Sequence, residues 1–114
     1  MLNWIKSRFG NKDMQWDGPV VPEPRAQCPC CDYIALAERG SYQICPVCFW
    51  EDDGQDIDEP DAPSGPNHGL TLREGRHNFE LFGACEPDMA RHVLAPDQRS
   101  RFRLQARELL GAAE

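Results

Sequence analysis

Residues 28–53 read CPCCDYIALAERGSYQICPVCFWEDD and contain two Cys-x-x-Cys pairs. The pairs are Cys28 with Cys31 and Cys45 with Cys48, and 13 residues lie between them. Each pair brings two thiolates close together, and a hairpin that joins the pairs would complete a tetrahedral four-sulfur site suited to zinc. The spacing therefore predicts that these four cysteines bind one metal ion. Iron in a rubredoxin-like site uses the same ligands and is the competing interpretation.

The predicted site is closed to substrates. Four thiolates fill every position of a tetrahedral zinc ion, so no position is left for water or for a reacting molecule. Elsewhere the sequence offers no serine–histidine–aspartate constellation and no glycine-rich phosphate loop. We therefore expect a non-enzymatic protein with one structural Zn²⁺ ion and no catalytic residues.

The residues around the pairs predict a small α+β fold that contains a zinc-ribbon-like β-hairpin. Tyr33–Ala37 and Ser41–Ile44 are the expected strands. Glu38-Arg39-Gly40 is the expected turn, because glycine adopts a positive φ angle without strain. Phe49 and Trp50 directly follow the second pair. We expect these two aromatic residues to shield the metal site and to begin a third strand.

Two or three C-terminal α-helices are expected to pack on this hairpin. The first begins at a capping box formed by Thr71 and Glu74 and ends at Gly83, which suits a left-handed C-cap. Its apolar face carries Leu72, Phe79 and Phe82. Gly75 lies inside this helix, and the lack of a side chain there is expected to permit a close approach to the ribbon.

Two further helices are predicted over residues 87–94 and 96–110. Pro87 would be the first residue of the former, and Gly111 would stop the latter. Arginines make this region the basic part of the chain: Arg91, Arg99, Arg101, Arg103 and Arg107. Many zinc ribbons bind nucleic acid, and these arginines are the feature that supports this alternative function.

Residues 1–27 differ in character from the rest of the chain. Leu2, Ile5 and Phe9 recur at helical spacing, and a proline-rich extended arm follows them. We therefore divide the chain into an N-terminal helix and arm, residues 1–27, and a zinc-ribbon domain with a helical C-terminal part, residues 28–114. The N-terminal helix is expected to pack on the domain; a membrane-surface anchor or a partner-binding arm is the alternative.

Charge and cysteine usage narrow the classes of function. The 114 residues carry a net charge of −7, which argues against general affinity for nucleic acid or anionic lipid. No apolar stretch approaches the roughly 20 residues of a membrane span, and the N-terminus lacks the apolar region of a secretory signal. Six cysteines without such a signal indicate the reducing cytoplasm, and metal binding rather than disulfides.

A run of seven acidic residues follows the second pair, within residues 51–61. Such a run is commonly a solvated loop, and otherwise it is a docking surface for a basic partner. We expect a protein–protein interaction module, for example an immunity or adaptor protein that binds a basic protein. The expected contact residues are Trp50, Glu51, Asp52, Asp53, Asp56 and Asp58.

The chain carries, in order, the motifs CPCC, YQICPVCFWEDDG, GPN, LTLREGRHNF and FGAC. These motifs resemble those of the bacterial cysteine-rich CPCC family, a group of small zinc-binding proteins. The resemblance extends from Cys28 to Cys85. It implies a fold that depends on zinc, but the family has no settled biochemical activity, so the resemblance implies a fold more than a function.

The remaining cysteines and the histidines receive weaker predictions. Cys30 lies inside the first pair, where N–H groups and a metal ion could lower its pKa and make it reactive. We favour an inert side chain, with thiol redox or metal sensing through Cys30 as a further alternative function. Cys85 is expected to be a buried thiol. His77 and His92 are expected at or near the surface, and His68 in a turn.

Overall fold

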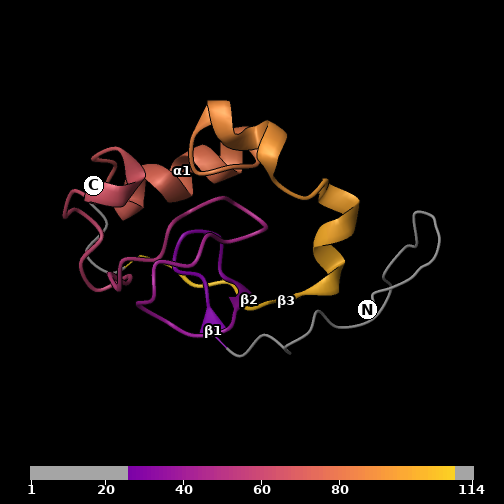
Figure 1. Ribbon diagram of the computed structural model, residues 1–114, viewed down its shortest axis with the longest axis horizontal. Helices are drawn as coiled ribbons and strands as arrows, with labels where there is room; N and C mark the ends of the chain where they lie inside the picture. The colour runs from indigo at the N-terminus through magenta and orange to yellow at the C-terminus, as the bar shows by residue number, and fades with distance from the viewer. Residues whose placement is uncertain (1–25, 110–114) are drawn as a thin grey trace.

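The computed structural model describes residues 26–109, and its helices and strands are shown in Figure 1. Three short strands form one antiparallel sheet: β1 (Ala26–Gln27), β2 (Tyr33–Leu36) and β3 (Arg103–Leu104). β2 is the central strand, and its residues Tyr33 and Ile34 lie opposite Leu104 and Arg103 of β3. The sheet therefore joins the beginning and the end of the described chain.

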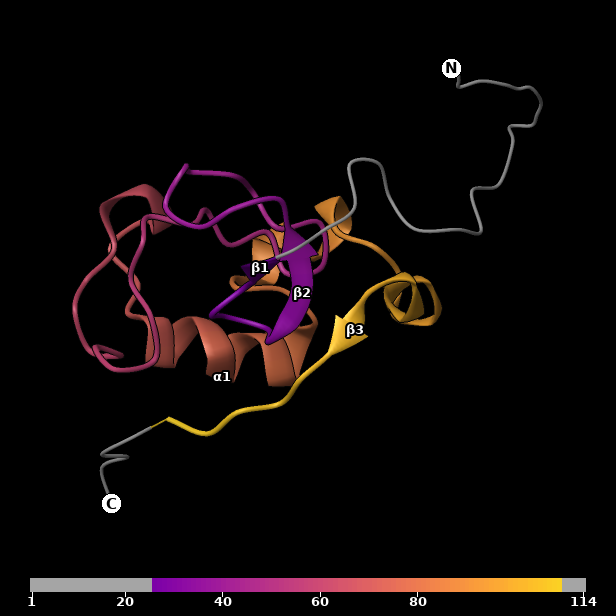
Figure 2. The same ribbon diagram turned by 90° about the horizontal axis from the view of Figure 1, so that it is seen from below.

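Residues 26–109 also form one α-helix and three short 3₁₀ helices. They are α1 (Leu72–Phe82), η1 (Gly65–Asn67), η2 (Pro87–His92) and η3 (Pro96–Arg101). Arg76 of α1 donates to the carbonyl oxygen of Arg107 at 2.7 Å, and Figure 2 shows the chain after β3 running in roughly the same direction as the helix. This arrangement confirms a small α+β fold.

Both predicted ends of α1 are confirmed. The N–H of Glu74 donates to the hydroxyl of Thr71 at 3.0 Å, and the N–H of Thr71 donates to the carboxylate of Glu74 at 2.9 Å. At the other end, Gly83 has a φ of 81° and its N–H donates to the carbonyl oxygen of Phe79 at 2.9 Å. These caps satisfy backbone groups that have no partner within the helix.

The predicted pairing of Tyr33–Ala37 with Ser41–Ile44 is wrong. β2 pairs with β1 and β3 instead. The second predicted strand pairs with the chain that follows the second cysteine pair, because Ile44 forms a bridge with Glu51. Each Cys-x-x-Cys pair therefore lies at the turn of its own short hairpin.

The C-terminal helices differ from their predictions. The second is a 3₁₀ helix that does begin at Pro87, but the third ends at Arg101, and residues 102–109 are not helical. Phe102 is extended and buried, and β3 follows it. Tertiary contacts of this segment outweigh the helix propensity of its residues. The predictions for residues 1–25 and for Gly111 lie outside the described residues.

Cysteine side chains make up much of the core. All six are buried, and they pack with Leu36, Val47, Trp50, Leu72 and Phe102. Among the described residues, Trp50 is the largest side chain that is completely buried. Few large aliphatic residues contribute, so packing alone supplies a small core. Within residues 26–109, no helix has the length and apolar character needed to cross a membrane.

Candidate metal centre

The first Cys-x-x-Cys turn connects β1 to β2. The N–H of Cys28 donates to the carbonyl oxygen of Tyr33 at 2.9 Å, and the N–H of Asp32 donates to the carbonyl oxygen of Cys28 at 2.9 Å. Asp32 has a positive φ of 68°, a conformation that aspartate adopts more readily than most residues. Two hydrogen bonds and one left-handed residue thus define the turn that holds Cys28 and Cys31.

The second turn repeats the backbone pattern of the first. The N–H of Cys45 donates to the carbonyl oxygen of Trp50 at 2.9 Å, and the N–H of Phe49 donates to the carbonyl oxygen of Cys45 at 2.8 Å. Phe49 has a positive φ of 74°, at the position that corresponds to Asp32. The two turns are therefore equivalent in their hydrogen bonds and in the place of their left-handed residue.

The four predicted ligands converge. The Sγ atoms of Cys28 and Cys48 are 3.6 Å apart, and those of Cys31 and Cys45 are 3.7 Å apart. All four Sγ atoms lie within 4.8 Å of one another. Zn–S bonds of about 2.3 Å in a tetrahedron place neighbouring sulfur atoms about 3.8 Å apart, whereas a disulfide requires about 2.0 Å. The spacing fits four thiolates around one ion, and all four cysteines are free thiols.

The buried cluster already favours negative charge on one sulfur. Burial raises the pKa of Cys45, but hydrogen bonds from the other three thiols outweigh it and lower that pKa well below the usual value. The N–H of Val47 also points at this sulfur, 3.4 Å from Sγ. Burial and the neighbouring thiols raise the pKa values of Cys31 and Cys48. A dication between the four sulfurs would favour the thiolate form of each.

Cys30 and Cys85 lie outside this group of four. Both side chains are 2% exposed. Burial raises the pKa of Cys30 and the pKa of Cys85, so both favour the protonated thiol. Oxidants and electrophiles react with exposed thiolates. The geometry therefore agrees with an inert Cys30 and a buried Cys85.

Asp32 anchors the first turn, a role that the sequence analysis did not identify. Its carboxylate accepts hydrogen bonds from both terminal nitrogens of Arg76 at 2.9 Å and from the backbone N–H of Arg107 at 2.7 Å. The side chain of Asp32 is only 4% exposed, so these cations offset the cost of burying its charge. Arg76 also donates to the carbonyl oxygen of Pro29 at 2.6 Å. Arg76 and Arg107 thus tie α1 and the C-terminal segment to the first cysteine turn.

Asp52 has a similar internal role in the second hairpin. It is completely buried, and Arg39 binds its two oxygens at 2.9 and 3.1 Å. Backbone N–H groups of Gly40 and Gly54 donate to the same carboxylate at 2.6 and 3.1 Å. The only indication of this role in the sequence was Arg39, which lies in a predicted turn. Asp52 therefore holds this loop together and has no exposed surface for a partner.

The expected contact residues are not gathered on one exposed surface. Trp50 is completely buried, so it is not available as a surface anchor. Asp53 accepts a hydrogen bond from the hydroxyl of Ser64 at 2.6 Å, and Asp56 pairs with two arginines of the same chain. Glu51 is partly buried, whereas Asp58 is exposed. Much of the acidic run is therefore neutralised within the fold.

Phe49 and Trp50 pack against the cluster of cysteines, as predicted, but they do not begin a third strand. Gly75 lets α1 approach closely, because a Cβ atom at this position would lie 2.8 Å from Cζ3 of Trp50 and 3.3 Å from Sγ of Cys30. Phe49 is partly buried against the core, and its ring lies 5.3 Å from the ring of His92. The chain after the second turn thus covers the sulfur cluster with aromatic surface.

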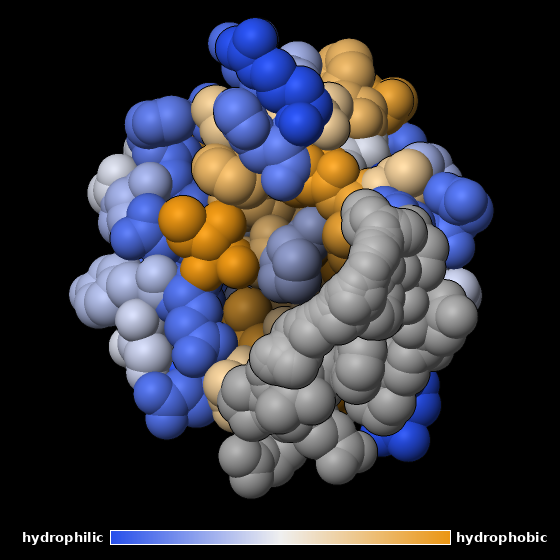
Figure 3. All heavy atoms as spheres, turned by 45° about the vertical axis from the view of Figure 1, so that its right-hand side comes forward, coloured by the Kyte–Doolittle hydropathy of each residue, from blue (hydrophilic) through white to orange (hydrophobic). Residues whose placement is uncertain are grey.

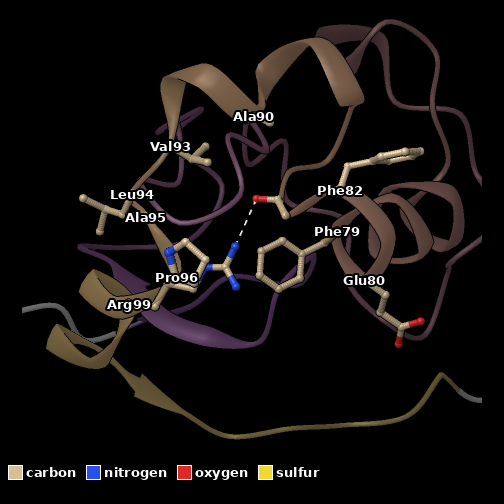
Figure 4. Close-up of a pocket in the computed structure, with 10 residues that line it drawn as sticks. Phe79, Glu80, Phe82, Ala90, Val93, Leu94, Ala95, Pro96 and Arg99 are labelled. Carbon is tan, nitrogen blue, oxygen red and sulfur yellow. Dashed lines mark hydrogen bonds between the residues drawn. The ribbon is translucent and has the colours of Figure 1, made fainter.

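A pocket of about 490 Å³ lies between the end of α1 and helices η2 and η3, and Figure 4 shows the residues that line it. Arg99 crosses this pocket: its guanidinium lies 4.7 Å from the ring centre of Phe79 and donates to the carbonyl oxygen of Gly83 at 3.4 Å. A cation at this place complements the C-terminal end of the helix dipole. Arg99, one of the arginines of the basic region, therefore makes these contacts within the fold.

Figure 3 shows one face of the molecule, where apolar residues lie near the middle and hydrophilic residues surround them.

The histidines lie apart from the sulfur cluster. His68 occupies a turn with a φ of 61°, and its Nδ1 is 2.7 Å from Oε1 of Glu86. His77 and His92 are exposed, as predicted. Among the described residues, the one group that could hold a metal ion consists of the four cysteines.

Comparisons with known proteins give one match. A family model described as cysteine-rich CPCC matches residues 26–100, a range that includes both Cys-x-x-Cys turns, the acidic run and α1. No curated protein and no solved structure matches the chain.

Proposed function

Because the chain belongs to the cysteine-rich CPCC family, we propose that it is a zinc-binding protein whose metal ion is structural. The observation that carries this proposal is the convergence of four buried thiols from two equivalent turns. Their 3.6 and 3.7 Å spacings match the edges of a zinc tetrathiolate. The ligands would be Cys28, Cys31, Cys45 and Cys48. Two hairpins that meet through their cysteine turns are typical of a zinc ribbon, which is the fold type that we propose.

The proposed ion would act on folding rather than on a reaction. When bound, it would link the two hairpins, and structural zinc contributes on the order of 10 kcal/mol of apparent binding free energy in small domains. Four protein ligands complete a tetrahedron, so substrates have no position on the metal. We therefore propose a non-enzymatic protein. Its six free cysteines suit a reducing compartment such as the cytoplasm.

Metal analysis of the purified chain tests this proposal. Protein prepared without chelator should contain one zinc per chain, and Cys28→Ser, Cys31→Ser, Cys45→Ser and Cys48→Ser should each lose it. Cys30→Ala is the matched control, because its thiol is buried beside the cluster but lies outside the four ligands. Measuring iron and zinc together separates the two metals. A parent chain without either metal, or a ligand variant with full metal content, would contradict the proposal.

We also propose that the protein acts by binding another protein, of basic character. The net charge of −7 supports this, and a zinc tetrathiolate would add to the negative potential. Three acids of the acidic run are exposed; Asp61 pairs with Arg73, and Asp58 and Glu59 are the two that would meet such a partner. Partners should be identified by co-purification and then tested against Asp58→Asn combined with Glu59→Gln. Binding should weaken without loss of fold; unchanged binding, or recovery of nucleic acid alone, would reject this role.

A further inference from the structure

Cys31 differs from the other three candidate ligands in its access to solvent. Cys28, Cys45 and Cys48 are completely buried, whereas Cys31 is 6% exposed. Cys31 also lines a cavity of about 230 Å³ between the first turn, α1 and the chain that follows β3. None of the other three ligands lines this cavity. The first part of the site that a dissolved molecule can reach is therefore Cys31.

One wall of this cavity is formed by residues 105–107, which we call the C-terminal strap. The N–H of Gln105 donates to the carbonyl oxygen of Asp32 at 3.1 Å, and the N–H of Arg107 donates to its carboxylate at 2.7 Å. The guanidinium of Arg107 pairs with Asp32 at 2.9 Å and with Asp56 at 3.3 Å. The strap is thus fastened to the residue next to Cys31.

One ion pair of the strap, between Arg107 and Asp56, is more exposed than the hydrogen bonds of the turn beneath it. The side chain of Arg107 is 25% exposed and that of Asp56 is 34% exposed, so water and salt compete for this ion pair. The hydrogen bonds of the first turn involve Cys28 and Asp32, both of which are buried. The strap can therefore open while the turn keeps its shape, and opening widens the path to Cys31.

We propose that metal ions enter and leave the site through the cavity at Cys31, and that the C-terminal strap limits the rate of this exchange. This inference rests on the zinc site proposed above. A competing ligand that reached the cavity would take the place of Sγ of Cys31 on the bound ion, and the released thiolate would accept a proton from the buffer acid. No electrons are transferred. The other three cysteines would release the ion after Cys31 has been displaced.

The rate of zinc transfer to a colorimetric chelator tests the proposal. Arg107→Ala removes both ion pairs of the strap and should release zinc about tenfold faster than the parent, which corresponds to about 1.4 kcal/mol. Arg107→Lys keeps the charge but loses the forked contact with Asp32, so an intermediate rate is expected. Arg103→Ala is the matched control, because Arg103 is an exposed arginine of β3 outside the strap. Its release rate should stay within about twofold of the parent.

A second measurement identifies the route. Iodoacetamide present during release alkylates each thiol as it becomes free, and mass spectrometry shows the order. Among the four ligands, Cys31 should be alkylated first. The proposal is overturned if another ligand reacts first, or if folded Arg107→Ala and Arg107→Lys chains release zinc at the parental rate. A parent chain without zinc would instead reject the metal site itself, so the two failures are distinguishable.

Discussion

Gly75→Ala should destabilise the protein although alanine is the better helix former. A Cβ atom at residue 75 would lie 2.8 Å from Cζ3 and 3.1 Å from Cε3 of Trp50, and 3.3 Å from Sγ of Cys30. Contacts below about 3 Å require that something moves. Trp50 is completely buried and its fused ring is rigid, so it has little room to retreat.

Two opposing terms set the size of the effect. Alanine in place of glycine in a helix interior stabilises by up to about 1 kcal/mol. Overpacking of a core costs about 1–3 kcal/mol, and a rigid, fully buried neighbour places this case in the upper half of that range. We therefore expect the free energy of unfolding to fall by about 1–2 kcal/mol.

Urea unfolding at saturating zinc, followed by far-ultraviolet circular dichroism, measures this change. Gly65→Ala is the control, because a Cβ atom there has no neighbour within 4 Å and should change the stability by less than about 0.5 kcal/mol. In a Trp50→Phe background the penalty of Gly75→Ala should shrink, because the fused ring is gone. A Gly75→Ala chain as stable as the parent, or an equal penalty in both backgrounds, would refute the reasoning.

Three further predictions concern buried and charged side chains. Asp52→Asn should lower the free energy of unfolding by about 2–3 kcal/mol, because its arginine loses a buried partner, whereas Asp58→Asn at the surface should change it by less than about 0.5 kcal/mol in the same urea titration. Burial raises the pKa of Asp56, but hydrogen bonds from an arginine and the backbone outweigh it and lower that pKa. The ionised Asp56 therefore contributes fully to stability above about pH 4, and this contribution is lost only as the pH falls through the pKa of Asp56 in the folded protein. The loss of unfolding free energy caused by Asp56→Asn should thus be constant from about pH 5 to 7 in urea titrations. Cys30→Ala and Cys85→Ala should each retain one zinc per chain by metal analysis, because neither thiol belongs to the group of four; loss of zinc from either would show that the ligand assignment is wrong.

The features that sequence predicts well are local. The Cys-x-x-Cys spacing identified the four thiols that converge in the structure. Thr71, Glu74 and Gly83 marked both ends of α1, because a cap acts on backbone groups only a few residues away. The close approach at Gly75 was also expected from the residue alone, since a glycine in a helix interior is costly unless space is short.

The features that sequence predicts poorly depend on contacts between distant residues. The sequence of residues 96–110 does not indicate that the helix ends at Arg101. The chain after Arg101 is extended, and it is held by contacts with Asp32, a residue far away in the sequence. The pairing of the strands failed for the same reason: β3 lies far along the sequence from β2. The acidic run looked like free surface because its arginine partners, Arg39 and Arg107, are themselves distant in sequence.

The equivalence of the two cysteine turns has a consequence for how the chain reaches its folded form. Each turn is closed by hydrogen bonds within six residues, so forming either one restricts very little of the chain. Bringing the turns together closes a longer loop, and the proposed ion, by binding to all four sulfurs, would offset the entropic cost of that step. Free zinc should therefore be a reactant in the slow step of folding. We expect the observed folding rate to rise with zinc concentration until formation of the two turns becomes limiting.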